Sequence, residues 1–124
     1  MGLVSAEAAP RFEMHGAEFT GLAAPSRGAR ETSVWRVRIA AGTPAVVHRL
    51  TREEVLVALS GRAQVTLAGE RFDFSAGAAV IVPPDTDFAL ANESAEPFEA
   101  VAILPVGGMA QVGNATPFTP PWAV

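Results

Sequence analysis

The sequence predicts an all-β domain folded as a sandwich or barrel, and three observations support this class. Apolar and polar residues alternate with a period of two along most of the chain, where a helix would repeat roughly every 3.6 residues. Gly, Pro, Asp or Asn interrupt the apolar runs about every 8 to 12 residues. The 124 residues, 49% of them hydrophobic, have the length of one domain and supply enough apolar side chains for a core.

The alternation predicts strands along the chain, and no segment shows the apolar stripe of a helix. We expect strands at residues 11–15, 18–23, 32–40, 45–50, 54–60, 62–68, 71–75, 79–83, 87–91 and 97–104. We expect one domain over residues 1–124, with a core at about 32–104, N-terminal strands within 11–23 and a tail at 105–124. The prolines of this tail exclude a helix or central strand, and its aromatic residues predict that it packs along the body.

The composition excludes several classes of partner and of chemistry. The 13 acidic and 9 basic residues give a net charge of −4, and the scattered bases are all arginine, so we expect no nucleic-acid partner. The absence of Cys, Tyr and Lys excludes thiolate, phenol and Schiff-base chemistry. The N-terminus has no signal-peptide pattern and no apolar run is long enough to cross a bilayer, so we expect no membrane partner and a cytoplasmic protein.

One segment carries a motif of chemically distinct residues. Five residues separate Gly42 from His48, Leu50 follows two positions later, and six residues separate Glu54 from Gly61. This spacing resembles the first conserved motif of the cupin family. The resemblance implies a double-stranded β-helix, the jelly-roll barrel of that family, with one mouth and an interior pocket.

A later segment resembles the second cupin motif. Five residues separate Gly77 from Pro83, and Phe88 stands where the family has a histidine. Asn92 follows four positions later, at the family's asparagine, whereas Asp85 replaces a glycine of the family's turn. The two motifs together extend the resemblance over the expected core of the domain.

The resemblance implies three histidines and one glutamate as metal ligands, and this chain keeps two of the four. The corresponding positions hold His48, Leu50, Glu54 and Phe88. Leucine and phenylalanine do not bind metals, and catalytic sites generally use about three protein ligands. We therefore expect no tightly bound metal and no cofactor, with a divalent ion held by His48 and Glu54 as the alternative.

His48 and Glu54 are the candidate catalytic residues. Alternation places His48 and Leu50 on one face, and a turn at 51–53 brings Glu54 back toward His48. Three interpretations stay open: a hydrogen-bonded relic, a metal-free binding or catalytic pair, and a metal site. Burial raises the pKa of Glu54 and a protonated His48 lowers it, so we expect the two groups to titrate as a unit.

We expect an apolar pocket in which His48 and Glu54 are the ionisable groups and Leu50, Phe88 and Trp35 form the walls. Such a pocket suits a small apolar or aromatic molecule with one polar handle, which predicts a metal-free binding protein. A second hypothesis is a small enzyme, either metal-dependent like the dioxygenases and isomerases of the family or a metal-independent proton-transfer catalyst. A third hypothesis is a structural dimerising barrel with a relic site.

Two residues outside the motifs have an ordinary and a functional interpretation. His15 is a surface residue beside Glu13, or it is a pocket ligand supplied by the N-terminal strand. Trp35 packs in the core, or it forms a wall of the pocket.

The strand that follows the first motif's glutamate predicts a homodimer. Val55, Val57 and Leu59 share one face, while Leu56 and Ala58 share the other. One apolar face lines the barrel interior. The other face needs the N-terminal strand, the tail or a second subunit to cover it.

Overall fold

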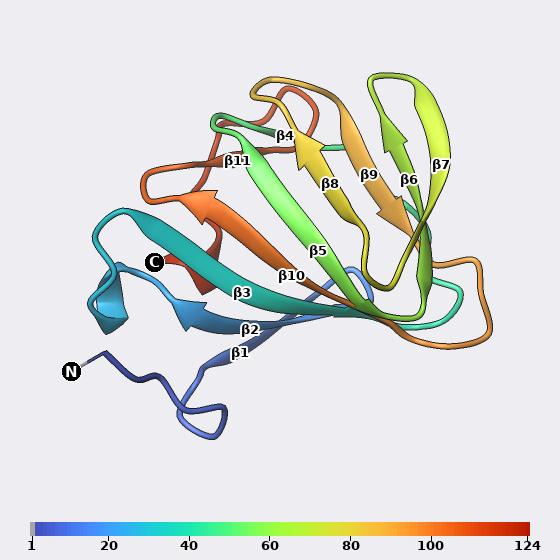
Figure 1. The fold of residues 1–124 in the computed structure, drawn as a ribbon. Helices are drawn as coiled ribbons and strands as arrows, with labels where there is room; N and C mark the ends of the chain where they lie inside the picture. The colour runs from blue at the N-terminus through green and yellow to red at the C-terminus, as the bar shows by residue number, and fades with distance from the viewer. Residues whose placement is uncertain (1) are drawn as a thin grey trace.

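The computed structural model describes residues 2–124, which form eleven β-strands and two short 3-10 helices. A six-stranded sheet has the order β1-β2-β3-β10-β5-β8, a three-stranded sheet has the order β7-β6-β9, and β11 pairs with β4. The sheets curve around a common interior as a jelly-roll barrel (Figure 1). The predicted all-β class and barrel architecture are confirmed.

The observed strands agree closely with the alternation of the sequence. They are β1 (Arg11–Met14), β2 (Ala17–Ala23), β3 (Thr32–Ile39), β4 (Arg49–Leu50), β5 (Glu54–Ser60), β6 (Arg62–Leu67), β7 (Glu70–Ser75), β8 (Ala79–Val82), β9 (Phe88–Ala91), β10 (Phe98–Pro105) and β11 (Ala110–Gln111), with 3-10 helices η1 (Pro25–Arg27) and η2 (Pro121–Ala123). With one exception, each predicted strand is found within one residue of its predicted ends. The short strand β11 lies in the tail and was not predicted.

The exception is the strand predicted at 45–50, which is wrong for most of its length. Only Arg49 and Leu50 form a strand, and His48 is joined to the neighbouring chain by an isolated bridge to Phe88. Residues 44–47 are exposed and pair with no strand, although Val46 and Val47 have the β-branched character of one. This segment instead runs past the mouth of the barrel.

The interior is built by side chains that stand in register across the large sheet. Trp35 lies opposite Ala102, Ala102 opposite Leu56, and Leu56 opposite Val80. All four are buried, and burial alternates residue by residue along β3 and β10. The period-two pattern of the sequence therefore corresponds to one inward and one outward face of each strand.

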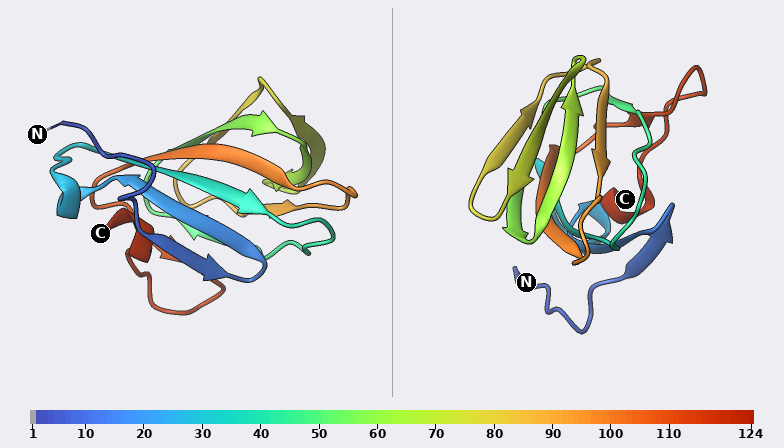
Figure 2. Two further views of the ribbon diagram at one scale, coloured as in Figure 1. Left: turned by 90° about the horizontal axis from the view of Figure 1, so that it is seen from below. Right: turned by 90° about the vertical axis from the view of Figure 1, so that its right-hand side faces the viewer.

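The C-terminal tail packs against the sheet. The rings of Trp122 and Phe19 are stacked, with centroids 3.6 Å apart and planes inclined by 2°. Trp122 is buried, and η2 contacts β2 and β3 (Figure 2). The tail thus packs along the body of the domain, which is what its aromatic residues predict.

Two turns explain residues of the family motifs. Gly61 has φ +76°, and a Cβ at this position would lie 2.4 Å from the carbonyl oxygen of Pro97, so only glycine fits. Asp85, which stands where the family has a glycine, also adopts a left-handed conformation with φ +55°. Aspartate is among the few residues that tolerate this region, and the turn is kept despite the substitution.

Candidate functional site

Glu54 and His48 reach the interior from two adjacent segments. Glu54 is the first residue of β5 and shares its inner face with Leu56 and Ala58. His48 directly precedes β4, where its backbone N–H and C=O exchange two hydrogen bonds of 2.9 Å with Phe88. This bridge fixes the backbone of His48 against β9.

These side chains lie on the wall of a cavity of about 170 Å³ inside the barrel. The cavity has walls from β2, β3, β5, β9, β10 and the C-terminal tail. All five residues that the sequence predicts as pocket residues line it, namely Trp35, His48, Leu50, Glu54 and Phe88. Most of the remaining lining is aliphatic or aromatic, so Glu54 and His48 are polar groups in an apolar surrounding.

Glu54 is a buried residue whose carboxyl group reaches the cavity without a protein partner. The residue is 5% exposed, and its side chain makes no hydrogen bond or ion pair within residues 2–124. Burial raises the pKa of Glu54 to about 8, because the charged form loses its hydration. The group therefore carries its proton at neutral pH and offers an O–H donor to the cavity.

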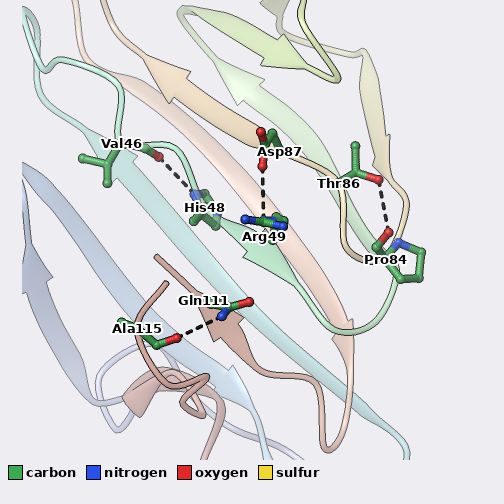
Figure 3. Close-up of polar contacts among 8 residues, drawn as sticks. All are labelled: Val46, His48, Arg49, Pro84, Thr86, Asp87, Gln111 and Ala115. Atoms are coloured by element: carbon green, nitrogen blue, oxygen red, sulfur yellow. Dashed lines mark hydrogen bonds and ion pairs between the residues drawn. The ribbon is translucent and has the colours of Figure 1, made fainter. Parts of the chain in front are cut away.

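His48 is held in one neutral tautomer. Its Nδ1 lies 3.1 Å from the carbonyl oxygen of Val46, which can only accept, so Nδ1 carries the proton (Figure 3). Burial lowers the pKa of His48, so the ring is neutral and Nε2 is an acceptor. The ring meets Phe88 edge to face at 5.3 Å. An exposed ion pair of 3.2 Å between Arg49 and Asp87 lies beside it.

His48 and Glu54 do not contact each other through an ion pair. No nitrogen of His48 lies within 4.0 Å of a carboxyl oxygen in residues 2–124. Burial is the cause of the raised pKa of Glu54, and no charge on His48 offsets it. The expected joint titration of the pair is therefore not supported, and burial is the stronger of the two effects.

The donor set does not fit the metal site that the fold family implies. Leu50 and Phe88 are buried at two of the four ligand positions and line the same cavity as His48 and Glu54. Across residues 2–124 no group of three or more His, Asp or Glu side chains is placed to hold a metal ion. Two ligands fall short of the roughly three that catalytic metal sites use.

The C-terminal tail supplies a wall that sequence reasoning missed. Val112, Phe118 and Trp122 line the cavity, although they lie more than 50 residues from Glu54 along the chain. A hydrogen bond of 3.0 Å from the Gln111 side chain to the Ala115 carbonyl shapes the loop between them (Figure 3). The aromatic content of the tail was the available indication of its packing, but not of its position on the cavity.

The residues with two interpretations lie as follows. His15 is exposed in the turn between β1 and β2, with φ +52°, and also borders the mouth of the cavity. Trp35 is 4% exposed, belongs to the core and forms part of the cavity wall. For Trp35 the two interpretations are therefore compatible.

Several solved structures share this fold. A RmlC-like cupin from Shewanella frigidimarina has a TM-score of 0.73 at 16% identity, covering 85% of this chain and 90% of that one. The polyketide cyclase RemF from Streptomyces resistomycificus has a TM-score of 0.79 at 13% identity, covering 94% and 87%. A cupin-superfamily sugar phosphate isomerase from Silicibacter pomeroyi has a TM-score of 0.73 at 13% identity, covering 90% and 82%. At these identities the likeness concerns the fold.

Sequence comparison assigns the chain to a family through a family profile, and not through a single relative. No curated protein shows significant sequence similarity to the chain. Among the described residues, no helix has the length and apolar character to cross a membrane. The profile of the family described as cupin domain matches residues 35–104, which is more than half of the chain. The chain therefore belongs to the cupin family.

Proposed function

We propose that this cupin binds a small, neutral, mostly apolar or aromatic molecule in its cavity, with Glu54 and His48 as the polar contacts. The observation that carries the proposal is the carboxyl of the buried residue Glu54, which faces the cavity and has no hydrogen-bond partner within residues 2–124. A protonated carboxyl that lines the cavity without a protein partner is free to donate its O–H to a ligand acceptor, and such a hydrogen bond contributes about 0.5–1.5 kcal/mol. A ligand with a hydrogen-bond acceptor should therefore bind with that acceptor at Glu54.

The size and charge of the cavity restrict the ligand. Its volume of about 170 Å³ is close to the roughly 150 Å³ of an apolar cavity that accepts benzene, so it suits one substituted ring. Within residues 2–124 no arginine lines it, although phosphate groups are usually held by arginine, lysine or clustered N–H donors. The sugar phosphate isomerase and the polyketide cyclase share the fold, and this lining suits a ligand without phosphate.

The arrangement also favours a second function, metal-independent proton transfer. Glu54 is protonated and His48 is neutral with a free Nε2, so the cavity offers one proton donor and one acceptor. On an enolisable ketone, Nε2 would accept the α-proton while the Glu54 O–H hydrogen-bonds and then protonates the carbonyl oxygen, giving the enol. The reverse transfers regenerate both groups.

The binding proposal is tested by calorimetry with phenol and cyclohexanone at pH 7. We expect both probes to bind, with benzoate much weaker because its charge meets an apolar wall. Glu54→Gln keeps an N–H donor and should retain binding, whereas Glu54→Leu removes the donor and should weaken it about tenfold. Glu53→Leu, at the exposed neighbouring residue, is the matched control. Failure of both probes to bind, or wild-type affinity in Glu54→Leu, contradicts the proposal.

The catalytic function is tested by proton exchange. Cyclohexanone is incubated with the protein in D₂O, and loss of its α-proton resonances is followed by NMR. An enzyme accelerates this loss in wild type, and Glu54→Gln abolishes the acceleration while still binding the ketone. Exchange at the rate of the buffer in wild type excludes the catalytic function and leaves binding alone.

A further inference from the structure

Half-exposed apolar side chains surround the mouth of the cavity. Met14, Val46, Val112 and Phe118, here named the apolar collar, are 36%, 37%, 43% and 37% exposed and line the same hollow as Glu54. Exposed apolar side chains that gather around one opening, instead of lying scattered over the surface, are typical of ligand-binding grooves. The collar therefore continues the apolar surface of the cavity outward.

The collar is assembled from three separate parts of the chain. Met14 ends β1, Val46 lies in the segment before β4, and Val112 and Phe118 lie on the tail that folds back through the bridge of Phe118 to Ala110. The segment 44–47 leaves the sheet there, which turns Val46 toward the mouth instead of into a strand pairing. Distant segments thus converge on a single apolar opening.

The hollow is partly open to the surface, and few polar groups line it. The polar side chains at this opening are those of His15 and Thr43. Within residues 2–124 no Asp or Arg lines the hollow, and the Glu that does, Glu54, carries its proton at neutral pH. A ligand that extends beyond the enclosed space would lie against apolar side chains and meet no charge.

We propose that the natural ligand is elongated, with a polar ring or head at Glu54 and His48 and an alkyl or aryl extension that lies on the apolar collar. The inference rests on the proposed function and adds the substrate class to it. Each methylene that moves from water onto the collar strengthens binding, by up to about fourfold when it is fully buried. The collar would therefore select long ligands over short ones.

A series of 4-alkylphenols tests the proposal in the wild-type protein. Affinities of phenol, 4-ethylphenol, 4-butylphenol and 4-hexylphenol are measured by calorimetry. We expect 4-hexylphenol to bind about tenfold or more tightly than 4-ethylphenol, because the added carbons reach the collar. In the double variant Val112→Ser and Phe118→Ser this ratio should fall below about threefold. Val47→Ser is the matched control, because Val47 is 53% exposed beside Val46 but does not line the hollow, and it should leave the ratio unchanged.

The outcomes separate this inference from the proposed function. Phenol binding that depends on Glu54, together with affinities that level off at 4-ethylphenol, overturns the collar proposal and leaves the proposed function standing. An equal ratio in wild type and in the double variant also overturns it. No binding of phenol or of any longer member overturns both.

Discussion

The first residue of β5 places a carboxyl group inside an apolar cavity, and this position gives the protein an unusual dependence on pH. Glu54 has a pKa of about 8 in the folded chain, against an ordinary value of 4.5. Between these values the folded state keeps a proton that the unfolded state has lost. The stability that the protonated Glu54 contributes is therefore fully present below about pH 4.5. It falls as the pH rises and levels off above about pH 8.

The variant Glu54→Gln isolates this effect. The free energy of unfolding of the variant relative to wild type should increase by on the order of 4 kcal/mol from pH 4.5 to pH 9. His48, buried in the same cavity and with its pKa lowered, contributes the opposite slope near pH 6.5 and cancels in the comparison. His15, at the mouth of the cavity, is present in both proteins and therefore does not affect the difference between them. The measurement is urea unfolding across this pH range, with the exposed Glu53→Gln as control. If the free energies of unfolding of Glu54→Gln and wild type differ by the same amount at every pH, the raised pKa of Glu54 is contradicted.

Two glycines with the same φ angle separate conformational strain from steric clash. Gly42 and Gly61 both have φ +76°, but a Cβ at Gly42 meets nothing within 4 Å, whereas at Gly61 it meets the Pro97 carbonyl oxygen at 2.4 Å. Gly42→Ala should cost about 1–2 kcal/mol of stability. Gly61→Ala should cost at least about 3 kcal/mol, because the backbone must move. Equal costs in chemical denaturation would show that the approach of Pro97 does not constrain the turn.

At the scale of the elements, the tail is a structural wall of the cavity. Trp122 is stacked on Phe19 and buried, whereas Phe118 is 37% exposed. We expect Trp122→Ala to destabilise the fold by about 3 kcal/mol, in the range of buried aromatic truncations, and Phe118→Ala by about 1 kcal/mol or less. Urea unfolding followed by circular dichroism compares them. A smaller cost for Trp122→Ala than for Phe118→Ala would mean that the tail does not support the barrel.

The strands were predictable where one face of each strand is buried, because burial on one face imposes alternation. β3 and β10 show this pattern without interruption. The segment 45–50 was not predictable, because strand formation there depends on partners distant in sequence. His48 is bridged to Phe88 and Arg49–Leu50 pair with β11, whereas residues 45–47 pair with no strand. Propensity alone favoured a strand at Val46 and Val47.

The candidate site likewise has one part that was predictable from the sequence and one part that was not. The spacing of the motifs brings His48, Leu50, Glu54 and Phe88 to one cavity, because strand pairing of a known barrel sets their positions. The wall formed by Trp122 was not predictable, since it depends on the path of a proline-rich tail that no periodic pattern describes. The balance between burial and charge at Glu54 was not predictable either, because it depends on whether His48 comes close enough for an ion pair, and within residues 2–124 it does not.

At the scale of the whole molecule, the outer face of the large sheet carries an apolar strip. Val34 lies opposite Ile103, Ile103 opposite Val55, and Val55 opposite Ile81, so four strands contribute in register. Ile81 is 60% exposed. Trp122 of the tail packs on the inner side, where it lines the cavity.

We propose that a second copy of the chain covers this strip in a homodimer. A two-fold axis pairs the strip with itself, and the neighbouring Arg36 is neutralised by an ion pair of 3.1 Å with Glu99, so no net charge there opposes the contact. Light scattering should show a dimer for wild type and a monomer for Ile81→Glu. Val47→Glu, which changes an exposed valine outside the strip, should stay dimeric. A wild-type monomer at micromolar concentration contradicts the proposal.

The central claim is that the cavity beside Glu54 holds a small neutral molecule, and the position of bound phenol tests it most directly. Intermolecular nuclear Overhauser effects are recorded between phenol and the isotopically labelled protein at pH 7. We predict contacts from the phenol ring to the side chains of Leu56, Leu90 and Ala102, which line the cavity wall. Contacts confined to surface side chains such as Ile81, or none at millimolar phenol, would contradict the claim.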